Sequence, residues 1–283
     1  MTFEIIDVFE NFKHDYHTRL TPESLFHTWF SAMSVAPTLR DLCIQDYLSA
    51  GEDWVQIAHQ TVFTRTHQDY VRMRRIHERL KALIPELHAT LHAFYPFPKT
   101  IKWVLYHGLG NGAGWSTTYQ GAPAILCGID KIAALDWSSD EELLRLCAHE
   151  YAHVVHAHLR GPLLPPHTPE HHPVLRLYVE GFASYYETFI AALPDRLTRW
   201  EKQCALIFDD LKRMYAQALV SNPAMCAKFF GDWTLIYELP DTGYYLGKQW
   251  VKALAQTYDF DTLARLPYDE LERSLETFLT GQS

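Results

Sequence analysis

The pentapeptide His149-Glu150-Tyr151-Ala152-His153 restricts this chain more than any other feature of its sequence. It is an HExxH motif, and residues four apart on an α-helix lie on one face, one turn above the other. Both imidazoles can therefore reach one zinc ion, and Glu150 can approach a water bound to that ion. Because so short a motif also occurs by chance, its sequence context decides whether it has this meaning.

The sequence on either side of the pentapeptide predicts one helix. Ser138 with Glu141, or Ser139 with Glu142, can form a capping box at its start. An apolar run leads into the motif, and Gly161-Pro162 ends the helix. The motif is therefore expected in the middle of a helix, where its two histidines can bind the same ion.

A catalytic zinc site usually has three protein ligands and one position open for water. One class of HExxH protein supplies a third histidine further along the same motif, but here that position is Leu159. A second class supplies a glutamate from the following helix. Glu180 fits this class, because it lies 27 residues after His153 on the next predicted helix, among apolar residues that are unusual on a solvated face. We therefore expect His149, His153 and Glu180 to hold one zinc ion.

Five further histidines follow the motif closely. His156 lies on a similar helix face, but three ligands from one straight helix converge poorly on one ion, so we expect it beside the ligands or in the core. His158 is expected at the surface. His167, His171 and His172 lie in a proline-rich loop, where they are either exposed to solvent or line the cleft.

The pattern from residue 3 to about 95 is helical. Thr21 and Pro22 are typical of a helix start, as N-cap and first helical residue. A longer helix is expected from about residue 61 to 94, and its arginines indicate either a nucleic-acid patch or a solvated face. The net charge of −9 favours the solvated face and argues against nucleic acid or an anionic membrane as partner. These arginines are Arg65, Arg72, Arg74, Arg75 and Arg79.

Three strands, rich in aromatic and β-branched residues, are predicted at residues 100–106, 115–119 and 122–128. Residues 108–114 have glycine at alternate positions, which suggests a flexible hairpin loop between the first two strands. Pro123 suits an edge strand, because proline cannot donate to a ladder on both sides. Further helices are expected at the end of the chain. They cover residues 174–221 with a break near 194, residues 243–258 and residues 268–279.

The five cysteines are scattered and none forms a CxxC pair, which is typical of buried thiols in a reduced, cytoplasmic protein. The N-terminal residues show no basic segment followed by a long apolar run, so no signal peptide is expected. No apolar run is long enough for a transmembrane helix.

The chain resembles the gluzincin-type metallopeptidases, and more closely a bacterial group described as predicted Zn-dependent proteases. The resemblance covers roughly residues 100–255 and has three parts: the helix at residues 148–155, Glu180-Gly181-Phe182-Ala183, and Gly243-Tyr244-Tyr245-Leu246-Gly247. It implies that His149, His153 and Glu180 are zinc ligands and that Glu150 is catalytic. It departs from thermolysin-like relatives at Ser184, where those carry an acidic residue, and Glu187 lies one turn further.

The resemblance also implies an edge strand before the active-site helix, which Ala122–Gly128 would supply. The predicted fold is therefore α+β and mostly helical, with a small antiparallel or mixed sheet whose edge strand packs on the HExxH helix, as in zincins. Residues 1–97 are expected to form an N-terminal helical subdomain, and residues 98–283 a zincin-like catalytic domain.

The expected activity is hydrolysis of peptide bonds, as an endopeptidase or oligopeptidase acting on a peptide or protein. Glu150 would take a proton from the zinc-bound water and return it to the leaving amine. The oxyanion needs another donor, for which Tyr244 is the first candidate, with Tyr245, His107 or a loop histidine as alternatives. Two other readings stay open: a non-catalytic zinc-binding or interaction protein on this scaffold, and core histidines without any metal.

Overall fold

The computed structural model describes residues 2–17, 20–161, 172–194, 196–232 and 234–281. Two compact units make up the chain, Met1–Glu150 and Tyr151–Ser283. The boundary expected between residues 97 and 98 lies inside the first unit. Helix α7 (Asp140–Arg160) runs without a break through the division between the units.

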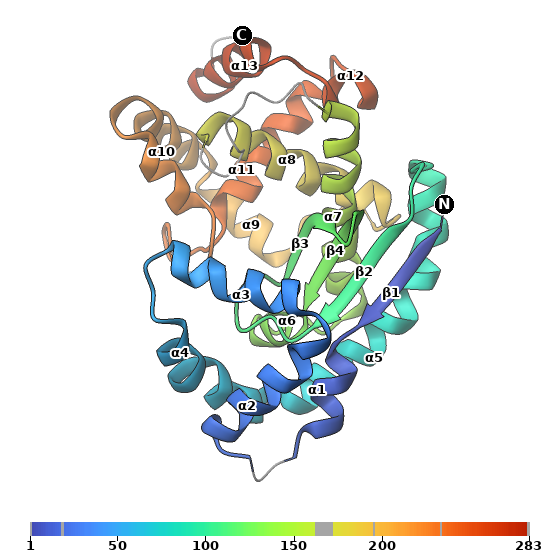
Figure 1. The fold of residues 1–283 in the computed structure, drawn as a ribbon. Helices are drawn as coiled ribbons and strands as arrows, with labels where there is room; N and C mark the ends of the chain where they lie inside the picture. Colours follow the sequence, from blue (N-terminus) through green and yellow to red (C-terminus); the bar gives the residue numbers. More distant parts are fainter. Residues whose placement is uncertain (1, 18–19, 162–171, 195, 233, 282–283) are drawn as a thin grey trace. The chain divides into compact units, whose positions relative to one another are not determined.

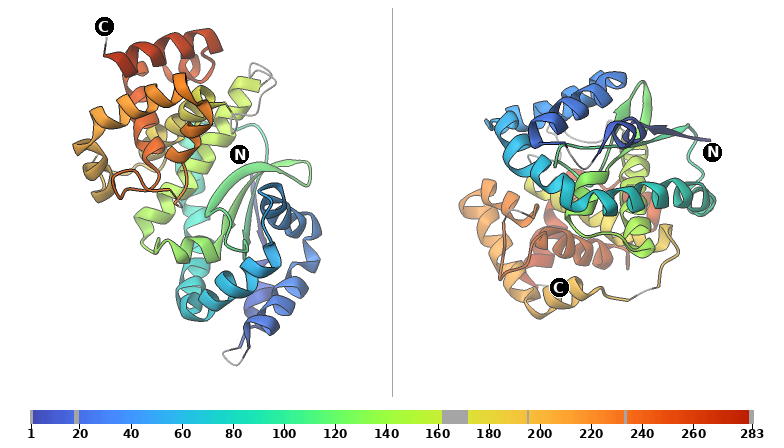
Figure 2. Two further views of the ribbon diagram at one scale, coloured as in Figure 1. Left: turned by 90° about the vertical axis from the view of Figure 1, so that its left-hand side faces the viewer. Right: turned by 90° about the horizontal axis from the view of Figure 1, so that it is seen from below.

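A four-stranded mixed sheet belongs to the first unit (Figures 1 and 2). Its strands lie in the order β1 (Phe3–Asp7), β2 (Ile101–Tyr106), β4 (Ala122–Gly128) and β3 (Gly114–Tyr119). The first three are parallel, and β3 is antiparallel to β4. The chain is otherwise mostly helical, so the α+β class and the small mixed sheet are confirmed.

The position of the edge strand is a correction to the sequence-based prediction. Ala122–Gly128 is β4, and it lies between β2 and β3, so the two edges are formed by β3 and β1. Pro123 fits inside the sheet because it pairs only with Thr118 of β3, and the ladder between β4 and β2 begins one residue later, at Ala124. The loop before β3 is not a hairpin loop either, because β2 and β3 flank β4 and do not pair.

Strand β1 was not predicted, because its residues were interpreted as part of a helical region. Phe3–Asp7 pairs in parallel with residues 101–105 of β2, about a hundred residues away in the sequence. Such distant pairing overrides local propensity, which is weak for so short a segment. The helices of this unit are α1 (Phe9–Asp15), α2 (Pro22–Ala32), α3 (Pro37–Ser49), α4 (Trp54–Ile57), α5 (Phe63–Phe94) and α6 (Ile129–Ala134).

The start of α2 confirms the prediction from the sequence. Thr21 caps α2 by accepting a hydrogen bond from the Ser24 backbone N–H at 3.2 Å, and Pro22 is its first residue. Helix α5 follows a π-helical turn at Ala58–Val62 and covers nearly the whole segment expected. Four of its five arginines pair with carboxylates. These pairs are Arg65–Asp69, Arg72–Asp69, Arg72–Asp136, Arg74–Glu78 and Arg79–Asp140.

The second unit is built from helices. They are the end of α7, α8 (Pro173–Ile190), α9 (Arg199–Leu206), α10 (Phe208–Ser221), α11 (Thr242–Leu254), α12 (Phe260–Ala264) and α13 (Tyr268–Thr280). Helices α8 and α11 cross very closely, since a Cβ added to Gly181 would lie only 2.3 Å from the carbonyl carbon of Gly247. The short helix α12 was not predicted from the sequence.

The turn after α12 contacts α7, and α12 itself contacts α8. Arg160, at the end of α7, donates a hydrogen bond to the Leu266 carbonyl at 2.9 Å, and Arg265 donates one to the Leu159 carbonyl. The Tyr178 hydroxyl on α8 donates to the Leu263 carbonyl. The Leu159 carbonyl lies in the last turn of α7, where carbonyl groups have no partner within the helix, and Arg265 supplies one.

No helix among the described residues is long and apolar enough to cross a membrane. The five cysteines, all of them described, are buried and free, as expected.

Candidate metal centre

Helix α7 begins with the second of the two capping boxes that the sequence allows. The Ser139 backbone N–H donates to the Glu142 carboxylate at 2.9 Å, and the Glu142 backbone N–H donates to Ser139 Oγ at 3.3 Å. The helix then continues to Arg160, followed by Gly161 in the left-handed region at φ +50°. The HExxH pentapeptide thus lies in the middle of a helix that is capped at its start.

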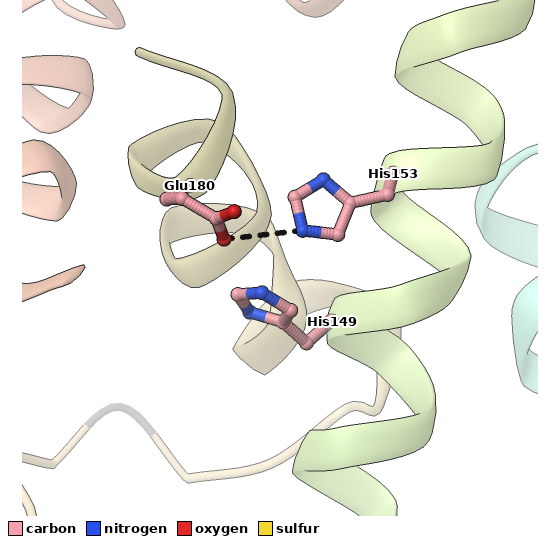
Figure 3. Close-up of side chains that lie close together, drawn as sticks. All are labelled: His149, His153 and Glu180. Carbon is pink, nitrogen blue, oxygen red and sulfur yellow. Dashed lines mark ion pairs between the residues drawn. The ribbon is translucent and has the colours of Figure 1, made fainter. Parts of the chain in front are cut away.

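Three side chains converge between α7 and α8 (Figure 3). His149 and His153 come from successive turns of α7, and Glu180 comes from α8. Each offers one ligand atom, and these three atoms all lie within 4.8 Å of one another. The structure therefore brings together the three residues expected to be metal ligands.

The separation of two of these ligand atoms suits a tetrahedral zinc ion. His153 Nε2 lies 3.3 Å from Glu180 Oε2. Two ligand atoms bound to tetrahedral zinc at about 2.0–2.1 Å would lie about 3.3–3.4 Å apart. The side chains of His153 and Glu180 are 13% and 21% exposed, so solvent reaches the group. Two imidazoles with one carboxylate are also a donor set that zinc prefers over magnesium or calcium.

Glu150 is buried, with 5% of its surface exposed, and it lies against the edge strand. A Cβ added to Gly114, the first residue of β3, would lie 2.9 Å from Glu150 Cγ and 2.9 Å from its Oε1. The edge strand therefore contacts the HExxH helix as expected, but the strand is β3 and not Ala122–Gly128.

The neighbouring histidines on α7 lie where the sequence predicts. His156 is buried and stacks on the Phe182 ring at a centroid distance of 4.1 Å. Burial, assisted by the nearby Arg160 and His153, holds the pKa of His156 well below its usual value. His156 is thus a neutral core residue, and His158 is exposed.

The loop histidines are only partly described. His172 is half-buried, and its Nε2 lies 3.2 Å from the Tyr268 hydroxyl. His167 and His171 lie outside the described residues.

The candidate oxyanion donors have different environments. Tyr244 is half-buried near the start of α11, where its ring lies 5.5 Å from that of Phe230. Tyr245 is buried and packs edge-on against Trp200 and Phe208. Of the two tyrosines, only Tyr244 keeps a partly open position.

His107 is wrong as a candidate oxyanion donor, because it is a core residue of the first unit. It is 1% exposed, and its Nε2 lies 3.3 Å from Thr66 Oγ1 while its ring packs on Phe12 and Phe63. Burial lowers the pKa of His107, although the nearby Asp130 opposes this effect.

The structure contains a second group of potential ligands that the sequence does not predict. Asp7, Glu10 and His77 also offer three ligand atoms within 4.8 Å of one another. His77 Nε2 lies 2.8 Å from Asp7 Oδ1, and Lys81 Nζ lies 2.7 Å from Asp7 Oδ2 and 3.8 Å from a Glu10 oxygen. The only sequence signal would have been Asp7 at the end of a strand, which was interpreted as helix.

The region around Ser184 differs from the thermolysin-like pattern. Ser184 is buried on α8, and Glu187 follows at a half-buried position.

Comparison of the chain with models of protein families, with curated proteins and with solved structures found no match. Its function therefore has to be inferred from its own residues and their geometry.

Proposed function

We propose that this protein is a zinc-dependent peptidase, in which His149, His153 and Glu180 hold one zinc ion and Glu150 is the general base. The observation that carries the proposal is the convergence of the three ligand atoms, with His153 Nε2 and Glu180 Oε2 at the spacing of two ligands of tetrahedral zinc. Three protein ligands leave one coordination position for water, as in catalytic zinc sites.

Zinc in such a site lowers the pKa of water and polarises the carbonyl of a substrate. Glu150 accepts the proton of the attacking water at its carboxylate and donates it to the leaving amine. Its position supports this role. Glu150 directly follows His149 and lies three residues before His153. It is 5% exposed and lies against the edge strand β3, so most water is excluded from its surroundings.

Tyr244 remains the first candidate for the donor that stabilises the developing oxyanion. It lies one helical turn before Gly247, the residue at which α11 crosses α8 beside Glu180. A tyrosine hydroxyl aimed at the place where charge develops can supply such stabilisation.

Strand β3 is the surface to which a peptide substrate would add. Within the described residues β3 pairs only with β4, so its other side presents unpaired backbone groups. An extended peptide can bind such an edge as an additional strand. This arrangement would bring the peptide backbone past Glu150, as an endopeptidase or oligopeptidase requires.

The Glu150→Gln variant tests the proposal. It keeps the size of the side chain and leaves the three ligands in place, so bound zinc should stay at one ion per chain. Loss of general acid–base catalysis should lower cleavage of an unfolded-protein or peptide panel by about 10²–10⁴-fold. Unchanged cleavage would refute the role of Glu150. Zinc binding without cleavage by the native protein would instead favour a non-catalytic zinc protein.

A further inference from the structure

Gly114 lies closer to Glu150 than any residue with a side chain could. A Cβ at this position would lie 2.9 Å from both Glu150 Cγ and Glu150 Oε1, and 2.7 Å from Leu146 Cδ1. Cβ atoms essentially never approach other heavy atoms within 3.0 Å, so a side chain here would force something to move. Gly114 is not in the left-handed region, so backbone conformation alone does not require glycine here.

The backbone at Gly114 is held in place from both sides. Gly114 pairs with Cys127 in the ladder between β3 and β4. In the loop before β3, the buried Asp130 carboxylate accepts hydrogen bonds from the backbone N–H groups of Gly108 at 2.5 Å and Gly110 at 2.6 Å. Because the strand cannot easily retreat, an added methyl group would displace the side chains of α7 instead.

We propose that Gly114 is a positioning residue for Glu150: the missing side chain lets the edge strand pack on the carboxylate and sets its conformation. This inference rests on the proposed function, in which Glu150 is the general base. The three atoms nearest to a Cβ at Gly114 belong to Glu150 and Leu146, and none belongs to a proposed metal ligand. A change at this position should therefore affect the base and leave the bound zinc intact.

Gly114→Ala and Gly112→Ala form a matched pair for the test. Gly112 lies in the loop just before β3 and is also outside the left-handed region. A Cβ added there would have its nearest contact at an ordinary 3.4 Å, with the Gly114 carbonyl oxygen. In Gly114→Ala, kcat should fall about 10–100-fold because the base is misplaced, while zinc content and KM change little. Gly112→Ala should keep native kcat. Equal activity of the two variants would overturn the inference.

A double-mutant cycle on thermal stability tests the same contact without measuring activity. Gly114→Ala should lower the Tm by about 2–4 °C in the native background. In the Glu150→Ala background two of the three close contacts are gone and only that with Leu146 Cδ1 remains, so this loss should become clearly smaller and the double variant should fold even if the single variant does not.

The outcomes of the cycle separate the inference from the proposed function. An undiminished loss of Tm in the Glu150→Ala background would show that Leu146 or the strand itself bears the strain, and would overturn the inference. Coupling between the two positions in a protein that cleaves no peptide would leave the placement of Glu150 by Gly114 intact and refute the peptidase activity.

Discussion

Two groups of potential metal ligands can be compared in this protein. His149, His153 and Glu180 form one group, and Asp7, Glu10 and His77 form the other, and in each the ligand atoms lie within 4.8 Å of one another. The first group has two imidazoles and one carboxylate, and two of its own members, His153 and Glu180, lie 3.3 Å apart. The second has one imidazole and two carboxylates, and both carboxylates contact a lysine.

This difference shows that proximity of donors does not by itself indicate a metal site. Lys81 Nζ, at 2.7 Å from Asp7, already places a cation in the second group, which is thus arranged as an ion-pair network. The first group combines the helical spacing of its histidines with the ligand separation of tetrahedral zinc. We therefore expect the first group to bind metal and the second to contribute stability.

The largest difference between the two groups is expected when one donor is removed from each and bound zinc is measured. Glu180→Ala should weaken zinc binding by more than about 100-fold, which exceeds the 10–100-fold effect of residues that only orient ligands. Asp7→Asn, the matched variant of the second group, should keep one zinc ion per chain. Metal analysis and competition with a chelator measure both. Loss of zinc from Asp7→Asn with retention in Glu180→Ala would reverse the assignment.

A smaller effect on zinc binding is expected from a substitution at the crossing of α8 and α11, next to Glu180. A Cβ on Gly247 would lie 2.4 Å from the Leu177 carbonyl oxygen, so Gly247→Ala should push α11 away from α8 and displace Glu180. Zinc affinity should fall about 10–100-fold, as for changes beside metal ligands. Lys252→Ala, at an exposed position on the same helix, is the control and should bind zinc as the native protein does. Equal zinc affinity of the two variants would show that the crossing does not set the site.

The smallest effect concerns the pH dependence of the second group. Burial raises the pKa of Asp7, but its interactions with His77 and Lys81 outweigh this and lower that pKa from 3.8 to about 2. A carboxylate with a lowered folded-state pKa stabilises the protein above its unfolded-state pKa, and this stability is lost as the pH falls through the folded-state value. Asp7→Asn should therefore cost about 2 kcal/mol of unfolding free energy near pH 6.

Urea unfolding of the native protein and of Asp7→Asn across this pH range measures that cost. The difference between them should shrink as the pH falls from about 4 towards 2, where Asp7 becomes protonated. Glu10→Gln, in the same group but more exposed, should change stability by less than about 0.5 kcal/mol. A difference for Asp7→Asn that stays constant from pH 6 to pH 3 would contradict the ion-pair interpretation.

The features that the sequence predicts correctly are local. The capped helix with the motif in its middle follows from a capping box, an apolar run and a terminal glycine within about twenty residues. The approach of Glu180 to the two histidines follows from an antiparallel return of the next helix and from apolar neighbours that are unusual on a solvated face. These signals require no knowledge of distant contacts.

The features that the sequence reading missed depend on distant contacts. Strand β1 exists because it pairs with β2 from far away, and five residues carry too little local pattern to indicate this. Pro123 indicated that Ala122–Gly128 is an edge strand, which is wrong. This strand lies inside the sheet because β3 pairs with it on the side away from β2. The second group of potential ligands cannot be predicted from the sequence, because it forms only when Asp7, at the end of β1, contacts His77 of α5.

The end of α12 and the turn after it constrain how the proposed ligands move. Arg160 of α7 is hydrogen-bonded to Leu266 in this turn, and Tyr178 of α8 is hydrogen-bonded to Leu263 in the last turn of α12. Neither helix can slide along its axis without breaking one of these bonds, so the imidazole of His153 and the carboxylate of Glu180 share a common anchor. Amide hydrogen exchange at the end of α7 and in the adjoining part of α8 should therefore report a single opening event, with one free energy for both helices.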